Sequence, residues 1–369
     1  MNRRTALRHL AATTAAIALP LAACSQTTDS ALDGPQSPLA APWAAWKAAY
    51  LTEDGRVVDG LQDGASHSES QGYGLLLAAL FGDDASFDNI FAWTEANLAI
   101  RGDALLAWRW FPRGTGTVPD RNNASDGDLF YAWALALRGT RDSDTAMIDR
   151  ASRIARDLVT ACVRPAPDGS GRLLFMPAAQ GFDDDTGALT INPSYYMPRA
   201  MRDLARVTGA NDLAICAADG EALMADLARA GLIPDWVKVQ AGGMVIPGDR
   251  PDRSGYEAMR VPLFLLWSGN AAHPALIRAA QAYQRANVAG RIASGEHVTV
   301  FDRVSGDVIE TSRHIGYGAV AALIACAAGR DRGAPIPFYR TVDQAYYPAT
   351  LHLMALIAQI TSARDCMPI

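Results

Sequence analysis

The segment Ser66–Leu77 carries the first side chain to which chemistry can be assigned. It reads Ser-His-Ser-Glu-Ser-Gln-Gly-Tyr-Gly-Leu-Leu-Leu, so that Glu69 opens an apolar, helix-like run. A carboxylate beside so much apolar surface is costly unless it is exposed, paired or used in a reaction. The sequence therefore predicts Glu69 as a catalytic acid, and Gly72 and Gly74 are interpreted as leaving room for a bulky ligand.

A second acidic segment, Asn122–Leu129, reads Asn-Asn-Ala-Ser-Asp-Gly-Asp-Leu. Ser125 and Asp128 have the spacing of a capping box at the start of a helix, which favours a structural role for Asp128. Asp126 is not needed for that cap, and Gly127 beside it would allow close approach of a ligand. We therefore interpret Asp126 as the functional acid of this segment.

Helical periodicity dominates the chain, and no regular alternation of strands and helices indicates a parallel sheet. Strand-like runs are short, at 243–246 and 298–301. No fixed repeat is visible, which disfavours a solenoid and favours an all-α toroid of about twelve paired helices, with function on the loops at one end. The helical candidates are 42–51, 71–81, 85–99, 126–138, 144–163, 194–207, 211–230, 257–268, 272–287, 312–328 and 343–361.

The two acidic segments together resemble glycoside hydrolase family 8. The residues that carry this resemblance are Ser-Glu-x-Gln-Gly-Tyr-Gly around Glu69 and Ala-Ser-Asp-Gly-Asp-Leu around Asp126. The resemblance extends from about Trp43 to Tyr347, and it implies an (α/α)6 barrel and an inverting endoglucanase. Further matching segments are Asp54–Asp59, Ala107–Trp108, Asn192–Tyr195 and Tyr256–Arg260.

By this resemblance, Glu69 is the proton donor and Asp126 holds the sugar in the subsite where the bond breaks. The segment Tyr256–Arg260 matches the region that supplies the general base. Many members have Asp in this motif, whereas this chain has Glu257, whose carboxylate extends one methylene further. Ser70 is a second departure, at a position where Gly is usual.

Inverting hydrolysis needs one protonated acid at the glycosidic oxygen and one ionised carboxylate facing a water, about 6.5–9.5 Å apart. Glu69 lies among apolar neighbours, a setting that favours the protonated form. Glu257 is expected in a wetter setting, held ionised by Arg253 and Arg260, with Arg260 orienting it at the substrate site. Alternatively Glu257 only pairs with an arginine on a helix face, and Asp252 is the reserve candidate for the base.

Aromatic side chains are the candidates for binding sugar rings, since ring faces stack on pyranoses. Tyr195 matches a family tyrosine that contacts the attacking water, and Tyr196 is the alternative. Trp108 and Trp110 are candidates for lining sugar subsites, although packing between helices would explain them equally well. Tyr73, one turn after the predicted acid, is a further substrate-binding candidate.

Other features exclude several classes of partner. The net charge is −6 and no basic stripe carries interleaved aromatics, which argues against nucleic acid. The scattered cysteines lack the spacing of a zinc site, although some could pair in an oxidising compartment. The run Asp183–Asp185 lacks the spacing of a calcium loop and is expected to be solvated. Two carboxylates suffice for glycoside hydrolysis, so no cofactor or metal is expected.

The N-terminus predicts export. Residues 1–24 combine a basic start with an apolar run too short to span a bilayer, as in a signal peptide. Residues 21–24 read Leu-Ala-Ala-Cys and resemble the lipobox of bacterial lipoproteins, which implies lipidation of Cys24; the Sec and twin-arginine routes both remain open. Residues 25–42 are expected to form a flexible tether, and residues 43–369 a single catalytic domain.

The sequence thus predicts a periplasmic, lipid-anchored (or secreted) endo-β-1,4-glucanase whose partners are a β-1,4-glucan and the membrane that holds the anchor. A polysaccharide synthesis and secretion complex is a further expected partner, by analogy with cellulases that accompany cellulose synthesis. One alternative keeps the fold and mechanism but changes the substrate to chitosan, xylan or mixed-linkage β-glucan. The other is a non-catalytic polysaccharide-binding lipoprotein.

Overall fold

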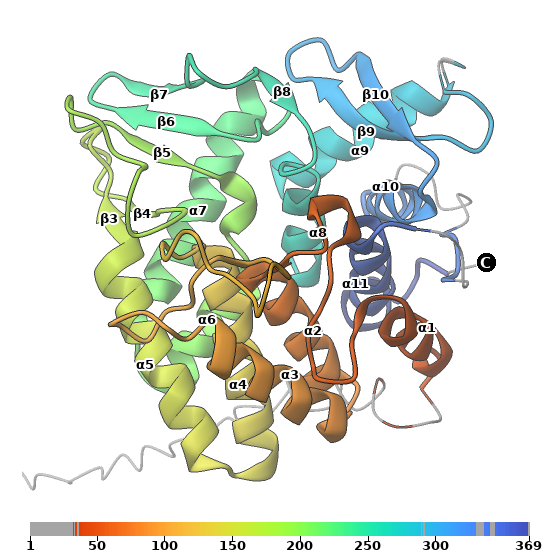
Figure 1. Cartoon of the computed structure of the whole chain (residues 1–369). Helices are drawn as coiled ribbons and strands as arrows, with labels where there is room; N and C mark the ends of the chain where they lie inside the picture. The colour runs from red at the N-terminus through yellow and green to blue at the C-terminus, as the bar shows by residue number, and fades with distance from the viewer. Residues whose placement is uncertain are drawn as a thin grey trace, which may run out of the picture.

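Paired α-helices make up most of the structure (Figure 1). The computed structural model describes residues 32, 34, 37–288, 290, 292–329, 336–339 and 344–367. Within those residues it contains eleven α-helices and ten short strands, which confirms the predicted all-α class with short β segments.

Six helices form a ring in which each packs against the next in chain order. In all of them except α6 more than two thirds of the residues are buried, because neighbours surround these helices on most sides. At the junction between the last and the first of these helices, Tyr346 at the start of α11 lies edge-on to His67, the residue before α2, with ring centroids 5.8 Å apart. These ring helices are α2 (Ser68–Leu80), α4 (Ser125–Asp142), α6 (Pro198–Thr208), α8 (Arg260–Trp267), α10 (Ile315–Ala327) and α11 (Tyr346–Ser362).

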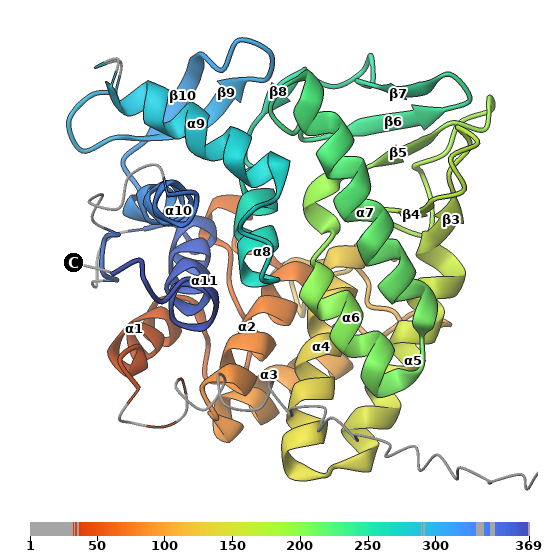
Figure 2. The same cartoon turned by 180° about the vertical axis from the view of Figure 1, so that it is seen from behind.

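The other five helices lie outside the ring, and four of them pack on the ring helix that precedes or follows them in the chain. Viewed from behind, α7 and α9 cover the outer sides of α6 and α8 (Figure 2). This alternation of inner and outer helices is an α/α barrel, as the helical patterns predicted. The outer helices are α1 (Ala40–Tyr50), α3 (Asp84–Asn97), α5 (Thr145–Cys162), α7 (Asn211–Ala230) and α9 (Pro274–Val288).

Short antiparallel sheets lie at one end of the barrel (Figure 1). The strand-like runs at 243–246 and 298–301 correspond to β7 and β9, whereas their partners β6, β8 and β10 were not predicted, since strands of two to five residues carry little periodicity. The strands are β1 (Ser66–His67), β2 (Arg109–Trp110), β3 (Val163–Pro165), β4 (Leu173–Phe175), β5 (Leu189–Ile191), β6 (Val237–Gln240), β7 (Gly243–Val245), β8 (Arg253–Ser254), β9 (His297–Asp302) and β10 (Val308–Ser312).

The start of α4 differs from the expected capping box. Ser125 is the first helical residue rather than the cap, and the cap position, Ala124, makes no side-chain bond. The Ser125 hydroxyl instead donates to the backbone oxygen of Met176 at 2.6 Å. A long-range contact has therefore replaced the local cap that the spacing suggested.

The N-terminal side of the barrel begins earlier than expected. Leu32 and Leu39 are buried in the core, and α1 starts at Ala40, inside the stretch 25–42 that was predicted to be a tether. Apolar burial attaches these residues to the domain. The predicted signal peptide and Cys24 lie outside the described residues, and no helix within the described ranges is long and apolar enough to cross a membrane.

Candidate active site

Three carboxylates converge on the guanidinium group of Arg260. Its Nη1 donates to Glu69 Oε2 at 2.5 Å and lies 3.5 Å from Asp126 Oδ2, and its Nη2 donates to Glu257 Oε2. Arg260 is 1% exposed, so these are charge-assisted bonds in a largely desolvated setting. The structure therefore brings all three predicted catalytic acids together, and the planar guanidinium holds them in one cluster.

Helices α2 and α4 place two of these acids side by side, because Glu69 and Asp126 both lie in the first turn of their helix. The helices touch through glycine: a Cβ on Gly127 would meet Ser68 Oγ at 2.3 Å, and one on Gly72 would meet the Gly127 oxygen at 2.8 Å. The interpretation that these glycines leave room for a ligand was wrong. They are required for the close contact between the two helices.

The start of α2 is fixed by a capping box. His67 Nδ1 accepts from the backbone N–H of Ser70 at 3.0 Å, and Ser70 Oγ accepts from the backbone N–H of His67 at 3.1 Å. His67 Nε2 lies 3.5 Å from Asp59 Oδ2, and its Nδ1 lies 4.0 Å from Glu69 Oε1. The unusual serine at position 70 thus secures the turn that carries the acid.

Glu257 lies in the turn before α8 and accepts from Asn192 Nδ2 at 3.0 Å and from Ser194 Oγ at 3.3 Å. It is the most exposed acid of the cluster, at 35%, as expected for a base that faces water. The prediction that Arg253 also holds it was wrong, because Arg253 pairs with Asp235 at 3.3 Å. Asn192 and Ser194 were identified from the sequence only as part of a matching segment, and their bonds to Glu257 were not predicted. Their polar side chains were the signal that could have indicated this role.

The driest acid of the cluster is Asp126 rather than Glu69. The side chain of Asp126 is 2% exposed, compared with 19% for Glu69. Burial raises the pKa of Asp126 well above its ordinary value, and the charge of Glu69 raises it further, while Arg260 opposes both. The dry setting predicted for Glu69 is therefore found at its neighbour, because Asp126 lies deeper between the helices.

Asp128 has the structural role that the sequence favoured, although not as part of a capping box. It accepts from the backbone N–H of Leu106 at 2.7 Å and from Asn123 Nδ2 at 2.9 Å, and it is completely buried. Burial raises the pKa of Asp128 to about 7. Asp128 thus ties the loop before β2 to the start of α4.

The two candidate tyrosines differ in position. The Tyr195 ring lies 5.7 Å from the Arg260 guanidinium, and burial followed by the charges of Asp126 and Glu257 raises the pKa of Tyr195. Tyr196 instead points into the core and accepts from a backbone amide of β4. The structure therefore places Tyr195, and not Tyr196, beside the acids.

Tyr73 lies behind the acids rather than at the surface. Its hydroxyl accepts from Arg260 Nη1 at 3.1 Å, and the residue has no exposed surface. In this conformation Tyr73 supports the guanidinium. Tyr347, which the sequence reasoning missed, is also near, with its ring 5.9 Å from the Arg260 guanidinium and its hydroxyl donating to the backbone of Tyr256.

Trp110 lies in β2, which pairs with β1 just before Glu69, and Trp108 directly precedes β2. Trp108 donates to Asp120 at 2.9 Å and has the Arg109 guanidinium 3.9 Å from its ring. Trp110 packs edge-on against Trp93 at 5.3 Å. Both residues are partly exposed.

A third tryptophan, Trp236, was missed because it stands alone before a short strand. Its ring stacks on Phe182 at 5.7 Å, and the Arg250 guanidinium lies 3.9 Å from it. Its ring centroid lies 6.4 Å from that of Tyr195, the tyrosine beside the acids.

The reserve base and the acidic run lie outside the cluster. Asp252 pairs with Arg303, whose Nη2 lies 3.1 Å from its Oδ2. Asp184, within the run Asp183–Asp185, pairs with Lys238 at 2.7 Å. Across the described part of the chain, no group of three or more His, Cys, Asp or Glu could hold a metal ion.

A barrel of paired helices with carboxylates converging at the start of its inner helices is suited to glycoside hydrolysis, which needs two placed acids. Residues 13–361 match the family described as Glycosyl hydrolases family 8. The chain belongs to this family and has its (α/α)6 barrel, as the two acidic motifs indicated.

Relatives agree with this assignment. A probable endoglucanase of Novacetimonas hansenii is 33% identical over 340 residues, which cover 90% of this chain and 94% of the relative. An endoglucanase of Cellulomonas uda is 32% identical over 230 residues, which cover 61% of this chain and 62% of the relative. The solved structure of endo-β-1,4-glucanase CMCax from Acetobacter xylinum has a TM-score of 0.76 at 32% identity, covering 88% of this chain and 98% of that one.

Proposed function

We propose that this enzyme is an endo-acting β-1,4-glucanase that cleaves cellulose-like chains with inversion. The observation that carries the proposal is the sharing of one guanidinium, that of Arg260, by Glu69, Asp126 and Glu257. Two carboxylates bound to one guanidinium lie within about 10 Å of each other, close enough to act on the same glycosidic bond. Endoglucanase relatives that cover most of the chain support the substrate class.

In this mechanism Glu69 donates a proton to the glycosidic oxygen and Glu257 takes one from the attacking water. Glu257 suits the base because it is the most exposed acid of the cluster and its Oε2 accepts from three donors, Asn192, Ser194 and Arg260. Asp126, at the bottom of the cluster, holds the sugar whose bond breaks. Glu69 bonds to Arg260 in the free enzyme, so the arriving glycosidic oxygen must replace that contact.

The proposal is tested with Glu69→Gln, which keeps the shape of the acid and removes its proton. We expect the rate of reducing-end release from carboxymethylcellulose to fall by at least about 10³-fold. Proton NMR of the wild-type reaction on cellopentaose should show the α-anomer first. A Glu69→Gln variant as active as the wild type, or a β-anomer formed first, would overturn the mechanism; a wild type that binds but never cleaves would establish the non-catalytic alternative.

A substrate panel separates glucan from the alternative polymers. A polycation such as chitosan requires uncompensated acids, and Asp184, in the only run of three acids in the sequence, is already paired with Lys238. We therefore expect faster release of reducing ends from β-1,4-glucan than from chitosan, xylan or mixed-linkage glucan. Faster cleavage of any of these three would reassign the substrate.

We also propose that the enzyme is exported and anchored through a lipid on Cys24. A disulfide joins Cys326 and Cys366, and structural disulfides are typical of exported proteins. Fractionation of cells that express Cys24→Ser should show the protein released from the membrane fraction. Equal membrane retention of the variant and the wild type would contradict the anchor.

An anchored glucanase suits trimming of a polysaccharide during its synthesis and secretion. Deletion of the gene should change the yield or chain length of the exported polymer. An unchanged polymer in the deletion strain would remove this cellular role while leaving the activity intact.

A further inference from the structure

Asp235 is a buried carboxylate that the mechanism above does not use. It lies between α7 and β6 and is 5% exposed. Its Oδ1 accepts from the backbone N–H groups of Gly255 at 2.8 Å and of Ala258 at 3.0 Å, which bracket Glu257 on both sides. Its Oδ2 accepts from Arg253 Nε at 3.3 Å, and its own N–H donates to the backbone oxygen of Arg253 at 3.1 Å. All of these contacts hold the one turn that carries the proposed base.

Glycine is required where this carboxylate approaches the turn. A Cβ added at Gly255 would lie 2.7 Å from Asp235 Oδ2. The backbone of Gly255 is not in the left-handed region, so the missing side chain serves the close approach of the carboxylate and not the conformation.

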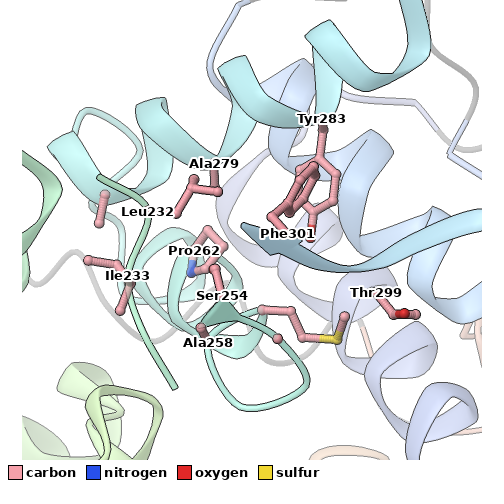
Figure 3. A pocket seen from close by; sticks show the side chains of 12 residues that line it. Leu232, Ile233, Ser254, Ala258, Pro262, Ala279, Tyr283, Thr299 and Phe301 are labelled. Carbon is pink, nitrogen blue, oxygen red and sulfur yellow. The ribbon is translucent and has the colours of Figure 1, made fainter. Parts of the chain in front are cut away.

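Packing leaves space behind this turn. A cavity of about 20 Å³ lies between the turn, α9 and β9, and Ser254, Ala258 and Pro262 line it from the side of the turn and α8 (Figure 3). Leu232 and Ile233 line it from the segment that leads to Asp235. Such a volume holds about one water molecule, so side-chain packing from this side does not by itself fix the turn. The hydrogen bonds to Asp235 hold the turn on the side where side-chain packing is incomplete.

We infer that Asp235 is the positioning residue for the general base, holding the turn Arg253–Ala258 so that Glu257 faces the attacking water. This inference rests on the proposed function, in which Glu257 is the base. The same turn also positions Arg260, whose backbone N–H donates to the backbone oxygen of Glu257 at 3.1 Å. Asp235 therefore positions both Glu257 and Arg260 without itself touching substrate.

The test is Asp235→Asn in the full-length enzyme, assayed on cellopentaose. The new NH2 group takes the place of Oδ2, so the side chain loses its charge and the bond from Arg253 Nε, which weakens its hold on the turn while keeping its size. We expect kcat to fall about 10–100-fold with KM within about 2-fold of the wild type, because displacement of a catalytic group by about 1 Å costs that much. A KM-against-kcat split of this kind does not follow from loss of stability alone.

Asp219→Asn is the matched control, because Asp219 on α7 likewise accepts from a backbone amide, that of Leu173 at 2.8 Å, away from the acids. It should lower the melting temperature with kcat unchanged. Gly255→Ala, which displaces the carboxylate but keeps its charge, should repeat the kcat loss and replaces Asp235→Asn if that variant does not fold. Wild-type kcat in either variant of the turn would overturn the inference.

Glu257→Ala separates this inference from the proposed function. If Glu257→Ala keeps wild-type kcat, the base assignment itself fails. If Glu257→Ala is inactive while Asp235→Asn behaves like Asp219→Asn, the base assignment stands and the positioning role of Asp235 is wrong.

Discussion

Arg260 organises the chemistry at the scale of single residues. One buried cation faces three acids, so the cluster is under-neutralised when all three are ionised. The raised pKa of Asp126 relieves that excess because its burial favours the neutral form. The cluster thus combines a buried acid with a raised pKa and two more exposed acids, an arrangement suited to general acid and base catalysis.

A neighbouring acid, Asp128, allows a pH-dependent prediction. Its pKa is about 7 in the folded protein, against 3.8 as the ordinary value, so between these pH values the folded state binds a proton that the unfolded state lacks. Wild-type stability should therefore lose this contribution as pH rises from about 4 to about 7. Asp128→Asn removes the titration, so the melting temperature of the variant minus that of the wild type should rise across this window and level off above it. A difference that stays flat from pH 4 to pH 8 would contradict the prediction.

At the scale of elements, the contact between α2 and α4 decides whether the acids meet. The two helices approach through Gly72 and Gly127, which allows their first turns to lie side by side. Larger residues would separate the helices and with them Glu69 and Asp126. Through this helix packing, the glycines of the two motifs determine how close Glu69 and Asp126 lie.

Gly127→Ala tests this contact. A Cβ there would lie 2.6 Å from the backbone nitrogen of Glu69, so α2 must shift. We expect a loss of about 1–3 kcal/mol of stability and a fall in kcat of about 100-fold, measured by thermal unfolding and by reducing-end release. Gly102→Ala is the control, because no atom lies within 4 Å of the added Cβ. Equal activity of both variants would show that the helices tolerate the shift.

At the scale of the molecule, a disulfide closes the end of the chain. Cys326 at the end of α10 bonds to Cys366 after α11, across 40 residues. The other two described cysteines, Cys162 and Cys216, are buried thiols, and burial raises the pKa of Cys162 to about 12. They are therefore poor competitors for exchange, which leaves one stable pairing.

Cys366→Ser should destabilise the barrel without affecting the chemistry. The cross-link restricts the unfolded chain, so its loss is expected to cost about 3–4 kcal/mol and to lower the melting temperature by about 5 °C or more. A reductant should produce the same shift in the wild type and none in the variant. The value of kcat at 25 °C should not change; if it falls in step with stability, the disulfide also shapes the active site.

The sequence by itself located the helices and indicated which acids would lie together. Apolar periodicity located all eleven described helices, because each buries one face or its whole surface and so leaves a local pattern. Glu69, Asp126 and Glu257 stand in short motifs whose order along the chain was enough to select them. These signals lie within a dozen residues, which is why they can be read without a structure.

Only the tertiary structure decided which partners these residues take. Arg260 rather than Arg253 pairs with Glu257, Asp126 rather than Glu69 is the driest acid, and the motif glycines serve helix contact. The contribution of Asp235 was likewise not readable, because its partners lie about twenty residues away with no pattern to join them. Such contacts depend on how the helices of the barrel pack together. This packing, and not the spacing of residues in the sequence, determines how deeply each acid is buried and which arginine it pairs with.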